Sequence, residues 1–260
     1  MMVPFTKASA CGNDFLIIEG RHMPADPGAF ARQICDRHSG VGADGVEWLF
    51  PSDDADLSIR LINADGSEAE ISGNGTRCVA AYAAANGGKE KLAIRTGAGI
   101  KHCELIRSNG NSFEFEMEMG TPQMGEPFTL MTASANVQGT PVSMGNPHYV
   151  VFVDKFSSTW QAEAGQIQKQ PCFHDGVNVE FVHVMGPNAI EVRFFERGVG
   201  ETQSSGTGSC ASAVAAIAAG RVQSPVSVQA PGGTQVVRWS GNKVFLRGPA
   251  QLICRGEFFA

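Results

Sequence analysis

The stretch IRLINADGSEAEISGNGTRCVAAYAAANG at residues 59–87 decides the fold, because VRFFERGVGETQSSGTGSCASAVAAIAAG repeats its pattern at residues 192–220. Both stretches begin with β-branched and other apolar residues, continue through a Ser-Gly-x-Gly turn and end in an alanine-rich run. Equivalent positions, such as Ser72 and Ser205, are 133 residues apart. Self-similarity at a fixed spacing indicates a duplicated structural unit.

The same spacing recurs in a separate part of the chain. Gly12 in CGNDFLIIE and Gly145 in MGNPHYVVFVD are also 133 residues apart. A shared register at separate points makes chance similarity a weak explanation. We therefore predict two copies of one α/β unit of roughly 120 residues, an ordinary domain size. The segment 120–127, with two glycines and two prolines, is predicted to link them.

Each copy is predicted to contain strands, then a helix, then further strands. The alanine-rich segments 76–85 and 209–219 are predicted helices, because alanine has the highest helix propensity. Runs of β-branched and aromatic residues predict the strands. They lie at 15–18, 46–50, 57–62, 92–96 and 113–117, and at 149–153, 179–184, 190–195, 226–229, 235–239 and 244–246.

Composition narrows the function classes. The chain has 26 acidic and 20 basic side chains, for a formal net charge of −6, which argues against nucleic acid or an anionic membrane as partner. No apolar run approaches the roughly 20 residues of a membrane span. The seven cysteines are an odd number without a Cys-x-x-Cys pair, which is typical of free thiols in a reducing compartment. We expect a cytoplasmic protein, for which a homodimer is the default oligomer.

The two Ser-Gly-x-Gly turns predict anion sites. Each leads into a predicted helix, whose first N–H groups are unpaired and whose N-terminal end carries partial positive charge. The glycines permit close approach to the backbone, so a carboxylate or phosphate fits there. One such turn is explained by ordinary helix capping. Two at matching positions are expected to face each other across a cleft between domains, where one group removes a proton from a carbon and the other supplies one.

Motifs along the whole chain resemble the diaminopimelate epimerase family. Besides the two serine turns they include GNDF (12–15), DRHSGVGAD (36–44), MGNPH (144–148), GVNVEF (176–181), ERGVGET (196–202) and GPAQLICRGEF (248–258). The resemblance implies an α/β fold of the α+β type with two pseudo-symmetric domains. Each domain consists mostly of antiparallel β-strands wrapped around a central helix. The implied domain limits are 1–118 plus 250–260 and 119–249, because the family's last strand returns to the first domain.

The resemblance also implies an activity and a set of site residues. Members are isomerases of lysine biosynthesis that invert the α-carbon of LL- and meso-diaminopimelate with no pyridoxal phosphate, metal or other cofactor, so a small amino acid is the expected partner. Carried over by motif, the catalytic positions are Ser72, Ser205, His148 and Glu196. The substrate-binding positions are Asn13, Asn63, Gly73, Asn74, Asn146, Asn178, Arg197, Gly206 and Thr207. The planar guanidinium of Arg197 suits the distal carboxylate of such a substrate.

The chain departs from the family at its two acid–base positions. The family uses two cysteines there, and this chain has Ser72 and Ser205. A thiol at a helix N-terminus ionises readily, whereas a serine hydroxyl needs an adjacent base. Gly45 stands where the family usually has glutamine, which removes one polar contact with the substrate. We therefore predict ligand binding with weak or absent turnover.

Three interpretations of the serines stay open. They were introduced to stop turnover, or the chain is a natural epimerase with activated serines, or it is a paralogue with another task on the same scaffold. That task includes racemisation of another amino acid, isomerisation or dehydration, and ligand binding without catalysis. Cys11 is a candidate replacement thiol, whereas Cys78 and Cys210 are expected inside the central helices. The six histidines form no metal-binding motif, so no metal site is predicted.

Overall fold

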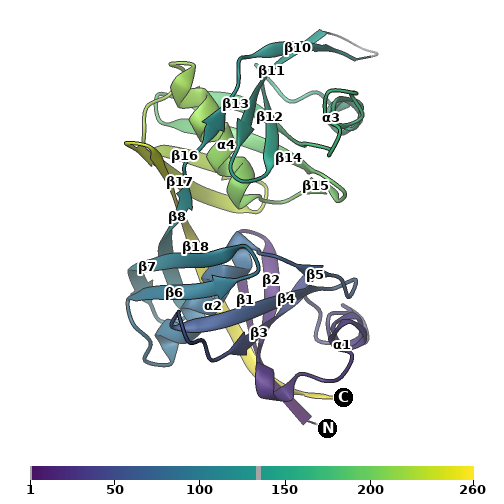
Figure 1. Ribbon diagram of the computed structural model, residues 1–260, viewed down its shortest axis with the longest axis vertical. Coiled ribbons are helices and arrows are strands. Elements are labelled where there is room, and N and C mark those ends of the chain that lie inside the picture. The colour runs from purple at the N-terminus through teal and green to yellow at the C-terminus, as the bar shows by residue number, and fades with distance from the viewer. Residues whose placement is uncertain (1, 133–135) are drawn as a thin grey trace. The chain divides into compact units, whose positions relative to one another are not determined.

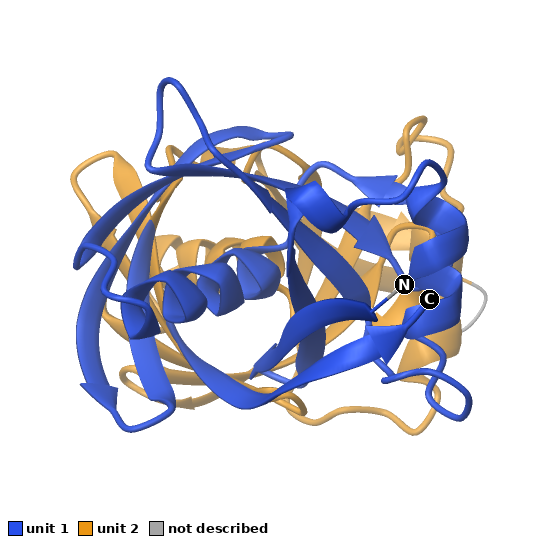
Figure 2. Cartoon of the chain, turned by 90° about the horizontal axis from the view of Figure 1, so that it is seen from below, with its two compact units in different colours: residues 1–117, 248–260 blue, residues 118–247 orange. Residues whose placement is uncertain are grey.

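A computed structural model describes residues 2–132 and 136–260 of the chain (Figure 1). The chain divides into two compact units, residues 1–117 with 248–260 and residues 118–247, which Figure 2 colours separately. The division falls inside strands β8 (Ser112–Gly120) and β18 (Lys243–Phe259), which pair with each other, and not in the predicted link at 120–127. Paired strands satisfy the hydrogen bonds of their backbone N–H and C=O groups with each other. In a glycine- and proline-rich link, these groups would have to bond to water instead.

The first unit contains helices α1 and α2, and most of its other residues lie in strands. Its elements in chain order are β1 (Met2–Ala10), β2 (Asn13–Glu19), a 3-10 turn (Gly20–His22), α1 (Pro27–Ile34), β3 (Gly45–Phe50), β4 (Leu57–Asn63), β5 (Glu68–Ala69), α2 (Gly73–Ala85), β6 (Lys91–Thr96), β7 (Gly99–Asn109), the first part of β8 and the last part of β18.

The second unit repeats this composition with helices α3 and α4. Its elements are the end of β8, β9 (Gln123–Met124), β10 (Phe128–Met131), β11 (Asn136–Ser143), β12 (Pro147–Phe152), α3 (Trp160–Gln168), β13 (Asn178–Gly186), β14 (Ala189–Glu196), β15 (Gly200–Thr202), α4 (Gly206–Ala218), β16 (Val226–Ala230), β17 (Gly233–Ser240) and the first part of β18.

The two units share one order of strand pairing. In the first, β2 is parallel to β3, β3 is antiparallel to β4, and β4 is parallel to β6. In the second, β12, β13, β14 and β16 repeat these relations in the same order. The register agrees as well, since Phe15 pairs with Gly45 as His148 pairs with Asn178, 133 residues later. The backbone therefore carries the predicted duplication.

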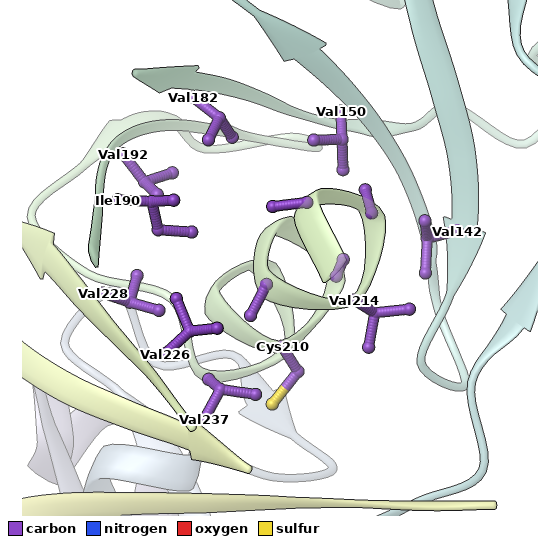
Figure 3. Packing of buried hydrophobic residues seen from close by; sticks show 14 of the residues in the cluster. Val142, Val150, Val182, Ile190, Val192, Cys210, Val214, Val226, Val228 and Val237 are labelled. Atoms are coloured by element: carbon purple, nitrogen blue, oxygen red, sulfur yellow. The ribbon is translucent and has the colours of Figure 1, made fainter. Parts of the chain in front are cut away.

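The helices α2 and α4 lie at the centres of their units. Residues 208–216 of α4 are all buried, as are residues 74–81 of α2. Figure 3 shows apolar side chains of the surrounding strands, Val142, Val150, Val182 and Val237 among them, directed at α4. A helix that is buried on every side needs small or apolar residues all round, which explains the alanine-rich composition. The predicted class, strands wrapped around a central helix, is confirmed.

Side-chain alternation along the strands decides which residues face the central helices. In β3, Val46 and Trp48 pack in one core with Phe30 and Ile34 of the outer helix α1. Successive residues of a strand point to opposite faces, so Glu47 between them faces α2. In β13, Val179 and Phe181 likewise pack with the outer helix α3, which leaves Glu180 facing α4.

Candidate active site

Ser72 caps the N-terminus of α2. Its backbone is extended, with φ −122° and ψ 120°, and its Oγ accepts a hydrogen bond of 3.1 Å from the Gly75 N–H. The side chain thus satisfies one of the N–H groups that a helix leaves unpaired at its start. In front of the turn, a Cβ added at Gly73 would meet no atom within 4 Å. A ligand therefore has room at this helix end.

Ser205 caps α4 in the same way and acts on a nearby acid. Its Oγ accepts a hydrogen bond of 3.2 Å from the Gly208 N–H, and Ser205 is one of the groups that act on the Glu196 carboxyl. Burial raises the pKa of Glu196 above its usual range, while Ser205 and His148 partly oppose that rise. A carboxylate of raised pKa beside a hydroxyl is a better proton acceptor than an ordinary glutamate.

A chain of hydrogen bonds runs through the second unit behind Ser205. His148 Nδ1 lies 2.7 Å from Glu180 Oε1, and both side chains are fully buried. His148 Nε2 lies 3.0 Å from Asn146 Oδ1, and Asn146 Nδ2 donates to Thr207 Oγ1 over 3.3 Å. Burial raises the pKa of Glu180, and the neighbouring histidine opposes this rise. These hydrogen bonds fix the orientation of Asn146, a predicted ligand contact, against the first turn of α4.

Asn178 and Arg197 are held together at the ends of neighbouring strands. Asn178 Nδ2 donates to the Pro147 carbonyl at 3.0 Å, and its Oδ1 accepts from the Arg197 N–H at 2.9 Å. The Arg197 guanidinium donates to the Asp175 carbonyl at 2.5 Å, and the residue is exposed. A tethered, solvent-facing guanidinium can receive a carboxylate with its remaining donors.

The predicted asparagines of the first unit fall into two places. Asn74 Nδ2 donates to Asn13 Oδ1 at 2.8 Å, and Asn13 Nδ2 donates to Asp44 Oδ2 at 2.9 Å. Asn63 lies at the end of β4, where its Nδ2 donates to Ser67 Oγ at 3.0 Å. Asn13 and Asn74 are thus one hydrogen-bonded pair beside the Ser72 turn. The predicted meeting of the two serine turns in one cleft stays a prediction.

Buried charged residues were missed from the sequence. Arg77 is fully buried in α2, where its guanidinium bonds Asn74 Oδ1 and its Nε donates to the Pro249 carbonyl at 3.3 Å. Glu47 is fully buried in β3, and neither of its carboxyl oxygens has a hydrogen-bond partner. Burial raises the pKa of Glu47 to about 8. The signal for Glu47 and Glu180 was present in their separation, which is the 133 residues of the repeat.

The second glycine of each serine turn is packed against one of these carboxyls. A Cβ at Gly75 would overlap Glu47 Oε1, and one at Gly208 would lie 2.8 Å from Glu180 Oε1. We expect Gly75→Ala to lower the free energy of unfolding by about 1–3 kcal/mol, the usual cost of overpacking. Gly73→Ala, in open space on the same turn, is the control and should change it by under about 0.5 kcal/mol. Equal urea midpoints for the two variants would contradict this packing.

The candidate replacement thiol does not have the environment of a reactive cysteine. Cys11 is buried, its Sγ accepts from Arg77 over 3.7 Å, and burial raises its pKa although the guanidinium opposes the rise. Cys78 and Cys210 are fully buried, and burial also raises the pKa of Cys78. A thiol of raised pKa supplies little thiolate. Within the described residues, the serines remain the groups at the two helix ends.

Two properties of the described residues bear on the class of site. In residues 2–132 and 136–260, no three His, Cys, Asp or Glu side chains are grouped as a metal ion would need. None of the described helices is long and apolar enough to cross a membrane.

The family model and the relatives found by sequence agree on one family, and solved structures share the fold. The family model described as diaminopimelate epimerase matches residues 5–125 and 140–253. A protein of Desulforudis audaxviator named diaminopimelate epimerase is 40% identical, and the match covers 98% of each chain. Among solved structures, a hydroxyproline epimerase from Agrobacterium vitis has a TM-score of 0.73 at 16% identity, covering 99% of this chain and 92% of its own. A Bacillus anthracis protein of the PhzF family also gives 0.73 at 16% identity, over the whole of both chains.

Proposed function

Because the chain belongs to the diaminopimelate epimerase family, we propose that it binds diaminopimelate and inverts its α-carbon slowly, with Ser72 and Ser205 in the two proton-transfer positions. It is an isomerase of a family whose role lies in lysine biosynthesis. The observation that carries the proposal is that both serines cap the N-termini of their helices, with Ser205 among the groups that act on the buried Glu196 carboxyl. A serine needs such a base to take up a proton from carbon.

The proposed reaction uses one serine from each unit. Ser205 passes its hydroxyl proton to Glu196 as its oxygen accepts the proton of the α-carbon. Ser72 then gives its own hydroxyl proton to the carbanion, which returns the carbon to four bonds with inverted configuration. Asn63 occupies the position in the first unit that Glu196 has in the second, 133 residues later. The Ser72 alkoxide thus lacks a partner of that kind, which is the physical reason for slow turnover.

The substrate's two ends are assigned to different groups. The α-carboxylate is proposed to bind at the helix ends, at Gly73 and Asn74 of α2 and at Gly206 and Thr207 of α4. The distal amino acid end is proposed to bind Asn63, Asn146, Asn178 and Arg197. The tethering of Arg197 through Asn178 and Asp175 supports this assignment, because a guanidinium held in place loses less freedom on binding.

Replacing Arg197 should separate ligands by their distal charge. We expect Arg197→Ala to weaken diaminopimelate binding about 10- to 100-fold, since a hydrogen bond to a charged group contributes roughly 1.5–3 kcal/mol. Binding of lysine, which has no distal carboxylate, should change less than about twofold. Arg193→Ala is the control, because Arg193 pairs with Glu191 on the same strand. Calorimetric titration that finds equal losses for both ligands would reject the assignment.

A further inference from the structure

Glu47 lies directly beneath the N-terminus of α2. Its side chain is fully buried, and its Oε1 occupies the space that a Cβ on Gly75 would need. Gly75 is the residue whose N–H the Ser72 hydroxyl accepts. An unpartnered carboxyl therefore stands one residue layer behind the turn where a ligand's anionic group is proposed to bind. When this carboxyl is ionised, its negative charge repels an anion in front of the turn.

In the second unit, the equivalent carboxyl, that of Glu180, has different surroundings. Glu180 is paired with His148, which stands where the first unit has Phe15. The end of α4 therefore has a carboxyl–imidazole pair behind it and a second carboxyl, Glu196, beside its serine. Behind the end of α2 stands the Glu47 carboxyl, neither of whose oxygens has a hydrogen-bond partner. The two helix ends are alike in backbone and unlike in charge.

The surroundings of Glu47 explain why its charge state matters. Its neighbours in register are Ile17 on β2 and Leu61 on β4, which carry no charge. On α2 it interacts electrostatically with the Cys78 thiol, whose pKa is itself raised by burial. The charges of Arg77 and Asp14 act on the pKa of Cys78 in opposite directions. For Glu47, burial alone raises the pKa, to about 8. A carboxyl with a pKa of about 8 is mostly uncharged at pH 7, so it leaves the positive end of α2 uncompensated.

We propose that Glu47 is a positioning residue for the substrate's α-carboxylate, and that the first unit accepts this anion only while the Glu47 carboxyl is protonated. The inference rests on the proposed function and deepens it. Ionised Glu47 places a negative charge behind the anion site in a poorly screened interior, so the anion is repelled. By linkage, binding of the carboxylate must favour the protonated form and take up a proton near the pKa of Glu47.

The test is calorimetric titration of the intact protein with diaminopimelate from pH 6.5 to 9. For the unaltered chain we expect affinity to fall at least about tenfold over this range, with proton uptake near pH 8 measured in buffers of different ionisation enthalpy. Glu47→Gln should remove the proton uptake and flatten the profile, apart from the ligand's own titration. Glu47→Met, which has no polar end, should behave like Glu47→Gln. Glu163→Gln, at a half-buried acid on α3, should keep the profile of the unaltered chain.

The outcomes separate this inference from the proposed function. Binding in all variants with coinciding pH profiles would overturn the role of Glu47 and leave the proposed function standing. Absence of diaminopimelate binding at pH 6.5 in both the unaltered chain and Glu47→Gln would overturn the proposed function and this inference with it. Loss of the pH dependence in both Glu47 variants, with the Glu163 variant unchanged, is the result expected.

Discussion

The double variant Ser72→Cys, Ser205→Cys should exchange the α-proton of diaminopimelate at least about 1,000-fold faster than the unaltered chain. A positioned general acid or base typically accelerates a reaction 10²–10⁴-fold. With serines in both positions, both the acid and the base are weaker than cysteines would be. Each new thiol would sit at the first turn of a 13-residue helix, where the positive helix end lowers a thiol's pKa. The exchange is followed by NMR in deuterated water at saturating ligand.

Single variants and a misplaced thiol control for this result. Ser72→Cys and Ser205→Cys alone should each stay well below the double variant, because inversion needs an acid and a base. Ser209→Cys adds a thiol to the same turn of α4, where Ser209 Oγ donates to Gln235 Oε1 at 2.9 Å, and should leave the rate unchanged. A double variant as slow as the unaltered chain would mean that the substrate is not diaminopimelate.

Glu47→Gln should make the protein more stable than the unaltered chain above about pH 5, by an amount that grows with pH. An acid whose folded pKa is raised from 4.5 to about 8 binds more protons folded than unfolded between these values, so stability falls as pH rises through that window. At about 1.4 kcal/mol per pH unit, the gap reaches roughly 3 kcal/mol at pH 7 and stops growing above about pH 8. Urea unfolding across pH 4.5–9 measures it.

The comparison isolates one group, because every other titrating side chain is common to both proteins. Glu180 and Glu196, whose pKa values are also raised, contribute equally to the two curves. At pH 4.5 the two proteins should differ little, since the glutamate is protonated in the folded state and still about half protonated in the unfolded state. A stability gap that is constant from pH 4.5 to 9 would show that Glu47 ionises normally.

The sequence predicted the class of fold from the repeat and missed elements with mixed patterns. The two central helices were placed at 76–85 and 209–219 and extend over Gly73–Ala85 and Gly206–Ala218. Helix α1 was missed although Asp26 caps it and Pro27 begins it, both of which are helix-start signals. The glycines and prolines at 120–127 suggested a link just beyond the point within β8 where the units divide, because residues 112–120 look like an ordinary strand and the turn residues follow it.

For the candidate site, the motifs identified side chains that are hydrogen-bonded neighbours within each unit. They did not identify the buried charged residues. His148, Asn146 and Thr207 form one hydrogen-bonded chain, and Asn13 pairs with Asn74. Glu47 and Glu180 were missed because an acid inside an apolar strand is usually solvent-facing, and only the two-sided packing of β3 and β13 buries them. Whether such an acid is buried depends on which face of its strand packs against the central helix.

NMR of diaminopimelate with the unaltered protein in deuterated water tests the central claim most directly, since one sample reports both binding and α-proton loss. We expect irradiation of the protein to transfer saturation to the ligand, and the ligand's α-proton signal to decay at least about 1,000-fold more slowly than with the double cysteine variant. Absence of saturation transfer, or proton loss as fast as with the cysteines, would contradict the claim.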